Sequence, residues 1–276
     1  MISYALFGNP VKHSKSPRIH QLFAEQMNIK HHTYGSICAS LENFKEELKN
    51  FFESGAHGAN ITVPFKKTAY NLSHKLTKRA LLAGSVNTIK KLEDNQLLGD
   101  NTDGIGLLID LKRINFIKPK DNILIIGAGG AAYGIIFPLL SYGCSIMINN
   151  RTISHAEEIV HRFKKYGNIS ILTNFNQYDH KFNIIINATS CGIYGKKPEL
   201  PNKLITPNIY CYDIFYQPKL TPFLQWCKQQ GCKQYTDGIG MLVAQAAESF
   251  LLWHGVLPPL QNVIKQIKDE TIISIP

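Results

Sequence analysis

The sequence lacks paired cysteines. Its six cysteines stand apart from one another, and none has the C-x-x-C spacing of a zinc or redox site. Disulfide frameworks are likewise built from many cysteines in short secreted chains. We therefore expect no metal site, and we expect most of the cysteines to be small core residues in a reducing compartment. They are Cys38, Cys144, Cys191, Cys211, Cys227 and Cys232.

Long apolar runs are also missing, and we expect no leader segment. No stretch approaches the roughly 20 apolar residues of a membrane span, and the chain enters a strand-like pattern at once, without a basic segment or a cleavage site. With 276 residues, 44% hydrophobic and 18% charged, the composition is typical of a soluble protein with one large or two medium domains. We expect a cytoplasmic protein without a membrane partner.

Acidic residues are scarce. Asp and Glu number 20 against 30 Lys and Arg, which gives a formal net charge of +10. Attraction of anionic ligands and a solvated lysine-rich surface both explain this charge. The basic residues are spread along the chain, and no helix-turn-helix, zinc-finger or RNP signature is present. Nucleic acid is therefore not an expected partner.

What the sequence does contain is a glycine cluster at the centre of residues 122–134. An apolar run, the glycines and a run of small residues predict strand, tight turn and helix. Gly127, Gly129 and Ala132 fit the G-x-G-x-x-G/A pattern, in which backbone approaches a pyrophosphate at the start of a helix. A glycine-rich turn with a packing role alone fits the same residues.

The strand predicted at 145–150 narrows this choice. In dinucleotide-binding domains its end lies at the adenosine ribose, where NAD-binding proteins carry Asp or Glu. Here Asn150, Arg151 and Thr152 take that place. A carboxylate repels a 2′-phosphate, whereas Arg pairs with it, so these residues favour NADP.

The first hundred residues alternate between strand and helix patterns, which predicts an α/β domain. A strand at 4–7 precedes Ser14 and Ser16; Ser16 with Pro17 reads as an N-cap and first helical residue. The same hydroxyls at a helix start also suit a carboxylate ligand. Ser40 is expected to cap a second helix, a strand is expected at 59–63, and residues 87–92 and 97–99 are expected to form a hairpin.

Two positions in this half have competing interpretations. Pro64 is expected to start a helix with Lys66 and Lys67 in its first turn, where the helix dipole disfavours positive charge. That broken rule suggests a function, while solvated surface lysines are the alternative. Asp103 precedes an apolar helix and fits a simple N-cap as well.

The second half continues as strand and helix. Strands at 182–187 and 209–215 and a helix between Thr221 and Gly231 are expected to complete a parallel sheet. Gly238 and Gly240 precede an apolar helix at 241–254 and suit either a hinge or a tight packing turn. Gln245 lies in that helix, and an exposed helical turn explains it as simply as a binding role.

Taken together, the chain resembles the shikimate dehydrogenase family along nearly its whole length. The motifs that carry the resemblance occur in order: FGNP (7–10), HSKSP (13–17), NITVPFK (60–66), AGSVNT (83–88), GDNTDG (99–104), GAGGA (127–131), NRT (150–152), NATS (187–190), YDIFY (212–216) and DGIGM (237–241) with Gln245.

The resemblance implies two α/β domains with a cleft between them. Residues 1–102 and 240–276 would form a discontinuous substrate-binding domain with a mixed, mainly parallel sheet, and residues 103–239 a Rossmann-type NADP domain. It implies reversible reduction of 3-dehydroshikimate to shikimate with NADPH, in chorismate and aromatic amino acid biosynthesis. A homodimer is left open.

The resemblance also implies roles for single residues. Lys66 and Asp103 match the catalytic pair, and a ketone reduced by hydride does need a proton donor and positive charge beside its oxygen. The implied substrate-binding residues are Ser14, Ser16, Thr62, Asn87, Asp103, Tyr216 and Gln245. The implied cofactor-binding residues are Gly127, Ala128, Gly129, Gly130, Ala131, Asn150, Arg151, Thr152, His155, Thr189, Gly238 and Met241.

The chain departs from the family pattern at two cofactor positions. Tyr133 and His155 stand where members often carry Arg. Histidine carries charge only when protonated, toward acidic pH, so we expect NADP to be preferred with an affinity that weakens as pH rises. The alternatives are a quinate/shikimate dehydrogenase with relaxed cofactor use and a catalytically silent nucleotide-sensing module; Lys66 and Asp103 together argue against the latter.

Overall fold

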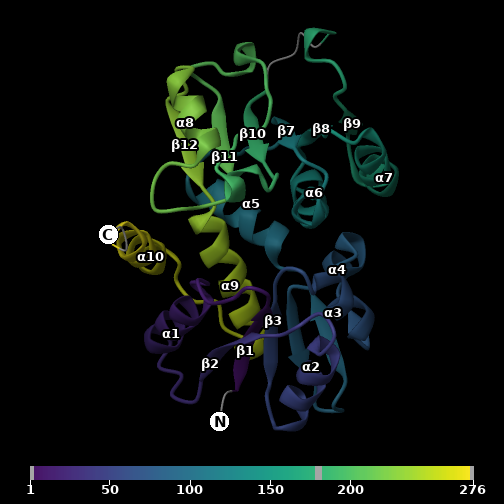
Figure 1. Ribbon diagram of the computed structural model, residues 1–276, viewed down its shortest axis with the longest axis vertical. Helices are drawn as coiled ribbons and strands as arrows, with labels where there is room; N and C mark the ends of the chain where they lie inside the picture. The colour runs from purple at the N-terminus through teal and green to yellow at the C-terminus, as the bar shows by residue number, and fades with distance from the viewer. Residues whose placement is uncertain (1–2, 178–181, 274–276) are drawn as a thin grey trace. The chain divides into compact units, whose positions relative to one another are not determined.

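The computed structural model describes residues 3–177 and 182–273 (Figure 1). Two compact units form within the chain. Unit 1 comprises Met1–Gly106 and Val243–Ile267, and unit 2 comprises Leu107–Leu242 and Lys268–Pro276. The outermost residues of the domain ranges expected from sequence, 1–2 and 274–276, lie outside the described part.

Unit 1 is built on a six-stranded mixed sheet in the order β2-β1-β3-β5-β6-β4. β1 runs parallel to β2 and β3, whereas β5 runs antiparallel to β3 and β6. The hairpin expected from sequence is confirmed as β5 and β6. The strands are β1 (Tyr4–Gly8), β2 (Tyr34–Cys38), β3 (Gly58–Ile61), β4 (Lys75–Leu76), β5 (Thr88–Lys91) and β6 (Leu97–Asp100).

Helices cover both faces of the central strands of this sheet. Figure 1 shows α1 on one side of β1 to β3 and α2 and α3 on the other. Since successive side chains of a strand point to opposite faces, Phe7 packs against Phe44 and Phe51 of α2, while Tyr4 packs against Trp253 of α9. The helices wholly within unit 1 are α1 (Ser16–Gln26), α2 (Phe44–Glu53), α3 (Lys66–Leu72) and α4 (Lys78–Ala83), while α5 (Asp103–Arg113), α9 (Ile239–His254) and α10 (Gln261–Ile273) have residues in both units.

Three helix starts in unit 1 differ from the sequence prediction. Ser40 does not cap α2: the cap residue is Asn43, whose N–H donates to Ser40 Oγ at 3.1 Å in the turn before the helix. Ser16 is not an N-cap: Lys15 caps α1, and Ser16 is its first residue. The reason is that Ser14 Oγ already accepts the Ser16 N–H at 3.2 Å. Pro64 does not begin α3, which starts at Lys66 after the cap residue Phe65.

Unit 2 is built on a parallel six-stranded sheet in the order β12-β11-β10-β7-β8-β9. This is the doubly wound arrangement, with β7 at the centre and the direction of winding reversing between β7 and β10. The parallel sheet expected from sequence is confirmed. The strands are β7 (Asn122–Ile126), β8 (Ser145–Asn149), β9 (Ile169–Ile171), β10 (Ile184–Asn187), β11 (Tyr210–Asp213) and β12 (Gln234–Asp237).

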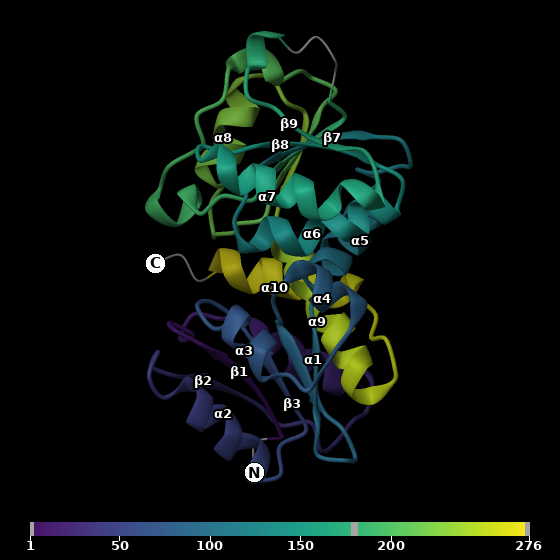
Figure 2. The same cartoon turned by 90° about the vertical axis from the view of Figure 1, so that its right-hand side faces the viewer.

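The helices of unit 2 pack along this sheet. Figure 2 shows α6 and α7 beside one another along β7 and β8. The helices are α6 (Gly130–Ser141), α7 (Ile153–Phe163) and α8 (Pro222–Gln229), with 3₁₀ turns at Lys164–Tyr166, Phe175–Gln177, Cys191–Tyr194 and Asn202–Leu204. The expectation that most cysteines are core residues is confirmed, because Cys144, Cys211, Cys227 and Cys232 are buried and all six are free thiols.

Three histidines pack into an aromatic cluster in unit 1. His20 is fully buried and stacks on Tyr34 with ring centroids 4.2 Å apart. Its two ring nitrogens have no hydrogen-bond partner among the described residues, and His32 Nδ1 lies 2.9 Å from His254 Nε2. Burial, followed by the charge of neighbouring histidines, lowers the pKa of His20 well below its usual range and that of His32 to about 4. The folded state therefore holds these rings neutral.

We predict that this cluster makes the fold sensitive to acid. Below the ordinary histidine pKa of 6.5 the unfolded chain binds protons that the folded chain does not, so the free energy of unfolding falls as pH falls toward about 4. The variant His20→Phe removes one such group at similar volume. Its thermal midpoint, followed by circular dichroism, should exceed that of the wild type at about pH 5 and match it at about pH 8. The exposed neighbour His31→Phe is the control, and an equal pH dependence of His20→Phe and wild type would contradict the assignment.

Candidate active site

Lys66 and Asp103 form an ion pair in unit 1. Lys66 is the first residue of α3 and Asp103 the first of α5, and Lys66 Nζ donates to Asp103 Oδ2 at 2.6 Å. Their side chains are 29% and 12% exposed, so the pair is accessible to a small ligand but shielded from bulk solvent. The interpretation of Lys66 as a solvated surface lysine is therefore wrong. The interpretation of Asp103 as an N-cap is wrong as well, because Asp103 is the first residue of α5 and its carboxylate accepts from Lys66 and Asn87.

Asn87 completes the surroundings of the carboxylate. It precedes β5 and is buried, and its Nδ2 donates to Asp103 Oδ1 at 2.7 Å. Its Oδ1 accepts the backbone N–H of Thr102 at 2.8 Å. Both carboxylate oxygens of Asp103 thus accept a hydrogen bond from a protein donor.

Gln245 belongs to the same group of side chains. Its Oε1 lies 3.3 Å from Asn87 Nδ2 and 3.4 Å from Thr102 Oγ1. Gly106 of α5 allows this approach, because a Cβ there would lie 2.7 Å from Gln245 backbone. The interpretation of Gln245 as part of an exposed helical turn is wrong.

Ser14, Ser16 and Thr62 lie at the carboxyl ends of β1 and β3. Ser14 Oγ donates to Ser16 Oγ at 3.2 Å, and the Thr62 N–H donates to the carbonyl of Phe7 at 2.8 Å. Gly8, the last residue of β1, packs closely against Thr62, because a Cβ at this position would collide with the Thr62 side chain. The two hydroxyls of Ser14 and Ser16 stand together at the start of α1, as expected for an anion-binding position.

The glycine turn of unit 2 has the geometry that a pyrophosphate requires. Gly127 has φ +105°, a left-handed conformation that favours glycine, and its Cα lies close to Ala188 after β10. Gly129 caps α6 and Gly130 begins it. A Cβ at either would meet nothing within 4 Å, so open space lies above the N–H groups of this helix start. The residues present therefore fit a phosphate group.

Asn150 ties this turn to the next helix. Its Oδ1 accepts the Ala128 N–H at 3.0 Å and its Nδ2 donates to the Thr152 carbonyl at 2.7 Å. The Ala128 N–H is therefore already hydrogen-bonded to a protein side chain. Arg151 and Thr152 are exposed beside it, and Thr152 caps α7.

A second polar set lies at the ends of β10 and β11. Asn187 Oδ1 accepts from Thr189 Oγ1 at 2.7 Å, and Asn187 Nδ2 donates to Asp213 at 2.9 Å. Asp213 is fully buried and also accepts from Thr221 Oγ1 at 2.5 Å. Burial raises the pKa of Asp213 to about 6 despite these donors. Of these residues only Thr189 is expected from sequence to bind the cofactor, although Asn187 and Asp213 stand in the NATS and YDIFY motifs.

The segment around Gly238 packs tightly within unit 2. A Cβ at Gly238 would collide with the Ile214 carbonyl, and one at Gly240 with the Asp110 carboxylate. Tyr212 Oη donates to Asp110 at 2.7 Å and accepts the Met241 N–H at 3.2 Å. These contacts favour the packing turn over a hinge.

Tyr216 also belongs to this unit. Burial, followed by the charge of Asp237, raises the pKa of its phenol.

The two departures from the family pattern occupy different places. Tyr133 Oη donates to Glu158 at 3.2 Å, and Arg162 lies over its ring at 5.2 Å. His155 is exposed in the first turn of α7, close in sequence to Arg151. Arg162 lies outside the motifs quoted above. It places a positive charge next to Tyr133, which stands where family members often carry Arg.

Comparisons with known proteins agree with this geometry. Three family models match in chain order: the shikimate dehydrogenase substrate binding domain at residues 6–89, shikimate / quinate 5-dehydrogenase at 112–197, and the shikimate 5'-dehydrogenase C-terminal domain at 238–268. Shikimate dehydrogenase from Aquifex aeolicus is 30% identical over 95% of this chain and 96% of its own, with a TM-score of 0.84. The chain belongs to the shikimate dehydrogenase family.

Two other solved structures extend this likeness. An Ael1 enzyme from Pseudomonas putida is 36% identical over 96% of this chain and 98% of its own, with a TM-score of 0.90. Shikimate 5-dehydrogenase from Thermus thermophilus, solved in complex with NADP(H) and shikimate, is 29% identical over 98% of this chain and 100% of its own, with a TM-score of 0.87. The α/β fold expected from sequence, with two sheets of mainly parallel strands, is confirmed.

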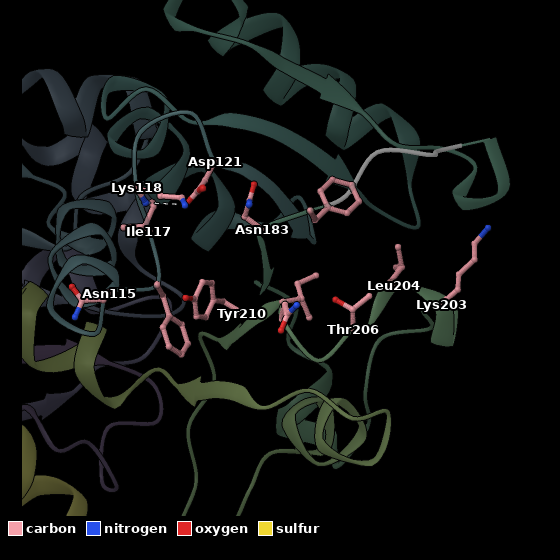
Figure 3. Close-up of a pocket in the computed structure, with 13 residues that line it drawn as sticks. Asn115, Ile117, Lys118, Asp121, Asn183, Lys203, Leu204, Thr206 and Tyr210 are labelled. Atoms are coloured by element: carbon pink, nitrogen blue, oxygen red, sulfur yellow. Dashed lines mark hydrogen bonds between the residues drawn. The ribbon is translucent and has the colours of Figure 1, made fainter.

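A further groove in unit 2 lies away from the family's motifs. It has a volume of about 770 Å³ and is lined by Asn115, Lys118, Asp121 and Tyr210, among others (Figure 3). Asn183 and Tyr210 lie at the amino ends of β10 and β11, whereas the glycine turn follows the carboxyl end of β7. Ligands of doubly wound sheets bind at the carboxyl ends, so this groove is separate from the candidate cofactor site.

Two negative results apply to the described residues. In residues 3–177 and 182–273, no helix is long and apolar enough to span a bilayer. Within the same ranges, no group of three or more His, Cys, Asp or Glu side chains is arranged to hold a metal ion.

We predict that Gly238→Ala destabilises the protein. The added methyl would meet the Ile214 carbonyl, and overpacking of this kind costs about 1–3 kcal/mol, or several degrees in thermal midpoint. Gly130→Ala is the matched control, because open space surrounds that Cβ and Ala suits a helix. Equal midpoints for the two variants in thermal unfolding would show that the segment has room to adjust.

Proposed function

We propose that the chain catalyses the reversible, NADPH-dependent reduction of 3-dehydroshikimate to shikimate, in the pathway to chorismate and the aromatic amino acids. The observation that carries the proposal is the 2.6 Å pair of Lys66 and Asp103, supported by Asn87, in a member of the shikimate dehydrogenase family. A protein that only senses a nucleotide has no need for a proton donor held beside a carboxylate. The enzyme is therefore assigned as an oxidoreductase acting on a CH–OH group.

The proton chemistry follows from this pair. Bound NADPH supplies the hydride that reduces the ketone. Lys66 donates a proton to the ketone oxygen as negative charge develops there, and in the reverse direction it accepts the hydroxyl proton. Asp103 holds the ammonium group in place through Oδ2 and keeps Oδ1 on Asn87. Lys66 and Asp103 are the proposed catalytic residues.

The proposed substrate contacts divide by chemistry. The hydroxyls of Ser14 and Ser16 bind the carboxylate of the substrate, because they stand together at the start of α1. The ring hydroxyls are bound by side chains that offer both donors and acceptors. These are Thr62, Asn87, Asp103, Tyr216 and Gln245. The related Thermus enzyme, solved with shikimate and NADP(H), supports the choice of ligands.

The proposed cofactor site is the glycine turn with the end of β8. The open space at Gly129 and Gly130 accommodates the pyrophosphate, and Arg151 with Thr152 binds the 2′-phosphate of NADP. Asn150 acts by holding the turn. His155 adds charge to this phosphate site when it is protonated. The remaining proposed contacts are Gly127, Ala128, Ala131, Thr189, Gly238 and Met241.

The two domains expected from sequence are proposed to have separate functions. We assign substrate binding to the domain 1–102 with 240–276 and NADP binding to the domain 103–239. The six free thiols support the proposed cytoplasmic location, since reducing compartments keep thiols unpaired.

The proposal is tested by assaying shikimate and quinate, each with NADP⁺ and NAD⁺, by absorbance at about 340 nm. Quinate is included because one matching family model also names it. We expect shikimate with NADP⁺ to give the highest kcat/KM, and we expect the KM for NADP⁺ to rise between about pH 6 and pH 8 as His155 loses its proton. Turnover of quinate alone would refute the substrate assignment. Equal efficiency with NAD⁺ would refute the cofactor preference, and a flat KM would refute the role of His155.

We predict that Lys66→Ala lowers kcat by about 10²-fold or more while KM for shikimate changes by less than about threefold, because general acid–base catalysis contributes such factors. Lys67→Ala is the control, since Lys67 is the next residue of α3 and is exposed. Steady-state kinetics of both variants provide the measurement. If Lys66→Ala raised KM and left kcat unchanged, Lys66 would bind substrate without acting on protons.

A further inference from the structure

A group of buried polar side chains lies behind Asn87 in unit 1. Asn60 comes from β3, Thr88 from β5 and Ser249 from α9, and each is at most 5% exposed. Thr88 and Ser249 are completely buried and 2.7 Å apart at their hydroxyl oxygens. Buried polar groups are costly unless they are paired. Asn60 and Thr88 stand in the NITVPFK and AGSVNT motifs, yet none of the three residues is among the proposed catalytic or substrate-binding residues.

The orientation of the Asn87 amide is fixed by a group that can only donate. The backbone N–H of Thr102 lies 2.8 Å from one amide atom, which must therefore be the oxygen. The other atom is then the nitrogen, and it donates to Asp103 Oδ1 at 2.7 Å. A flipped amide would place its NH₂ group against the Thr102 N–H and its oxygen against the carboxylate.

The orientation of Asn60 follows in the same way. Its Nδ2 lies 3.2 Å from the carbonyl oxygen of Asn87, which can only accept. Its remaining donor capacity is directed at Thr88 Oγ1 and Ser249 Oγ, at 3.1 and 3.0 Å. Asn60 Oδ1 accepts from the phenol of Tyr34 at 2.8 Å.

Thr88 Oγ1 lies 2.9 Å from Asn87 Oδ1, which can only accept, so Thr88 donates there. The single hydroxyl proton of Ser249 has two acceptors within reach, the Gln245 carbonyl at 3.1 Å and Thr88 Oγ1 at 2.7 Å. Hydrogen bonds thus run from Thr88 to the Asn87 oxygen and from the Asn87 nitrogen to Asp103, with Ser249 packed beside Thr88. Polarised chains of this kind strengthen their last member.

We propose that Thr88, supported by Ser249 and Asn60, is a positioning residue for the reaction. It holds the Asn87 amide so that Asn87 donates to Asp103 Oδ1 while Asp103 Oδ2 pairs with Lys66. The inference rests on the proposed function for its kinetic consequences. The geometry of the chain from Ser249 to Asp103 stands on contacts within unit 1 alone.

The charges near Asp103 allow the direction of the effect to be worked out. Lys66 faces its Oδ2. The carboxylate of Asp100 is paired with Arg79 at 2.6 Å, and Arg79 also pairs with Glu248 at 3.0 Å. A carboxylate that loses a donor takes up a proton more readily. Weakening the Asn87 contact should therefore move the low-pH limb of the rate profile to higher pH.

The test compares Thr88→Val, Thr88→Ser and Ser249→Ala with the wild type. Valine keeps the shape of threonine and removes the hydroxyl, whereas serine restores it. We expect Thr88→Val to lower kcat about tenfold, since losing one ordinary buried hydrogen bond has an effect of about this size, with KM for shikimate within about threefold. The acid limb of kcat should move up by about one pH unit, and Thr88→Ser should restore both. Ser249→Ala should show the same changes to a smaller degree.

Ser73→Ala is the matched control. Its hydroxyl is half-buried and donates to the Ala69 carbonyl at 2.8 Å, outside the chain from Ser249 to Asp103. Thermal unfolding of every variant identifies any general loss of stability. If Thr88→Val were as active as Ser73→Ala with an unchanged pH profile, or if Thr88→Ser failed to restore activity, the positioning role would be wrong.

A readout without turnover separates this inference from the proposed function. The carboxyl carbon of Asp103, assigned through Asp103→Asn, can be titrated by ¹³C NMR in the wild type and in Thr88→Val. We expect the titration midpoint to lie about one pH unit higher in Thr88→Val. An unchanged midpoint would overturn the inference even if the enzyme turns over shikimate. A shifted midpoint in a wild type without shikimate activity would refute the proposed function and leave the positioning intact.

Discussion

The arrangement of unit 1 depends on the ion pair between two helix starts. Lys66 and Asp103 are the first residues of α3 and α5, so their backbones are fixed by the strands that lead into those helices. A lysine at a helix start is opposed by the dipole, and the carboxylate of Asp103 at 2.6 Å offsets this cost. Asn87 then satisfies the second carboxylate oxygen. Strand ends therefore place the two backbones, and buried side chains such as Asn87 orient the pair.

In unit 2, glycines allow close approach of the backbone, both at the proposed phosphate site and between segments of the protein itself. Gly127 adopts a conformation that side chains disfavour, and Gly129 with Gly130 leaves the start of α6 open. Gly238 and Gly240 serve the opposite purpose, because protein atoms fill the space that a side chain would need. The same residue type thus marks access in one place and close packing in the other. Sequence alone could not distinguish the two.

Much of the fold could be predicted because periodicity and turn chemistry are local. The hairpin of β5 and β6 and the strand-turn-helix around Gly127 are examples. The N-cap at Ser16 was wrong because the competing hydroxyl of Ser14 lies two residues earlier. The strand β12 was missed because its residues QYTD are polar and half-exposed. The candidate site was found where motifs carry it. Thr88 ends the AGSVNT motif, but Ser249 comes from a distant helix, and only their contact in three dimensions relates the two.

Asn150 has a consequence for how cofactor choice can change. The position where NAD-binding relatives of this fold carry an acid is here a structural tie, since its amide accepts from Ala128 and donates to Thr152. An aspartate could replace the first bond but not the second, because a carboxylate has no N–H to give. A switch toward NAD through this residue would therefore loosen the loop that we propose as the phosphate site. Drift in cofactor preference is easier at Arg151, whose exposed side chain can change without disturbing the turn.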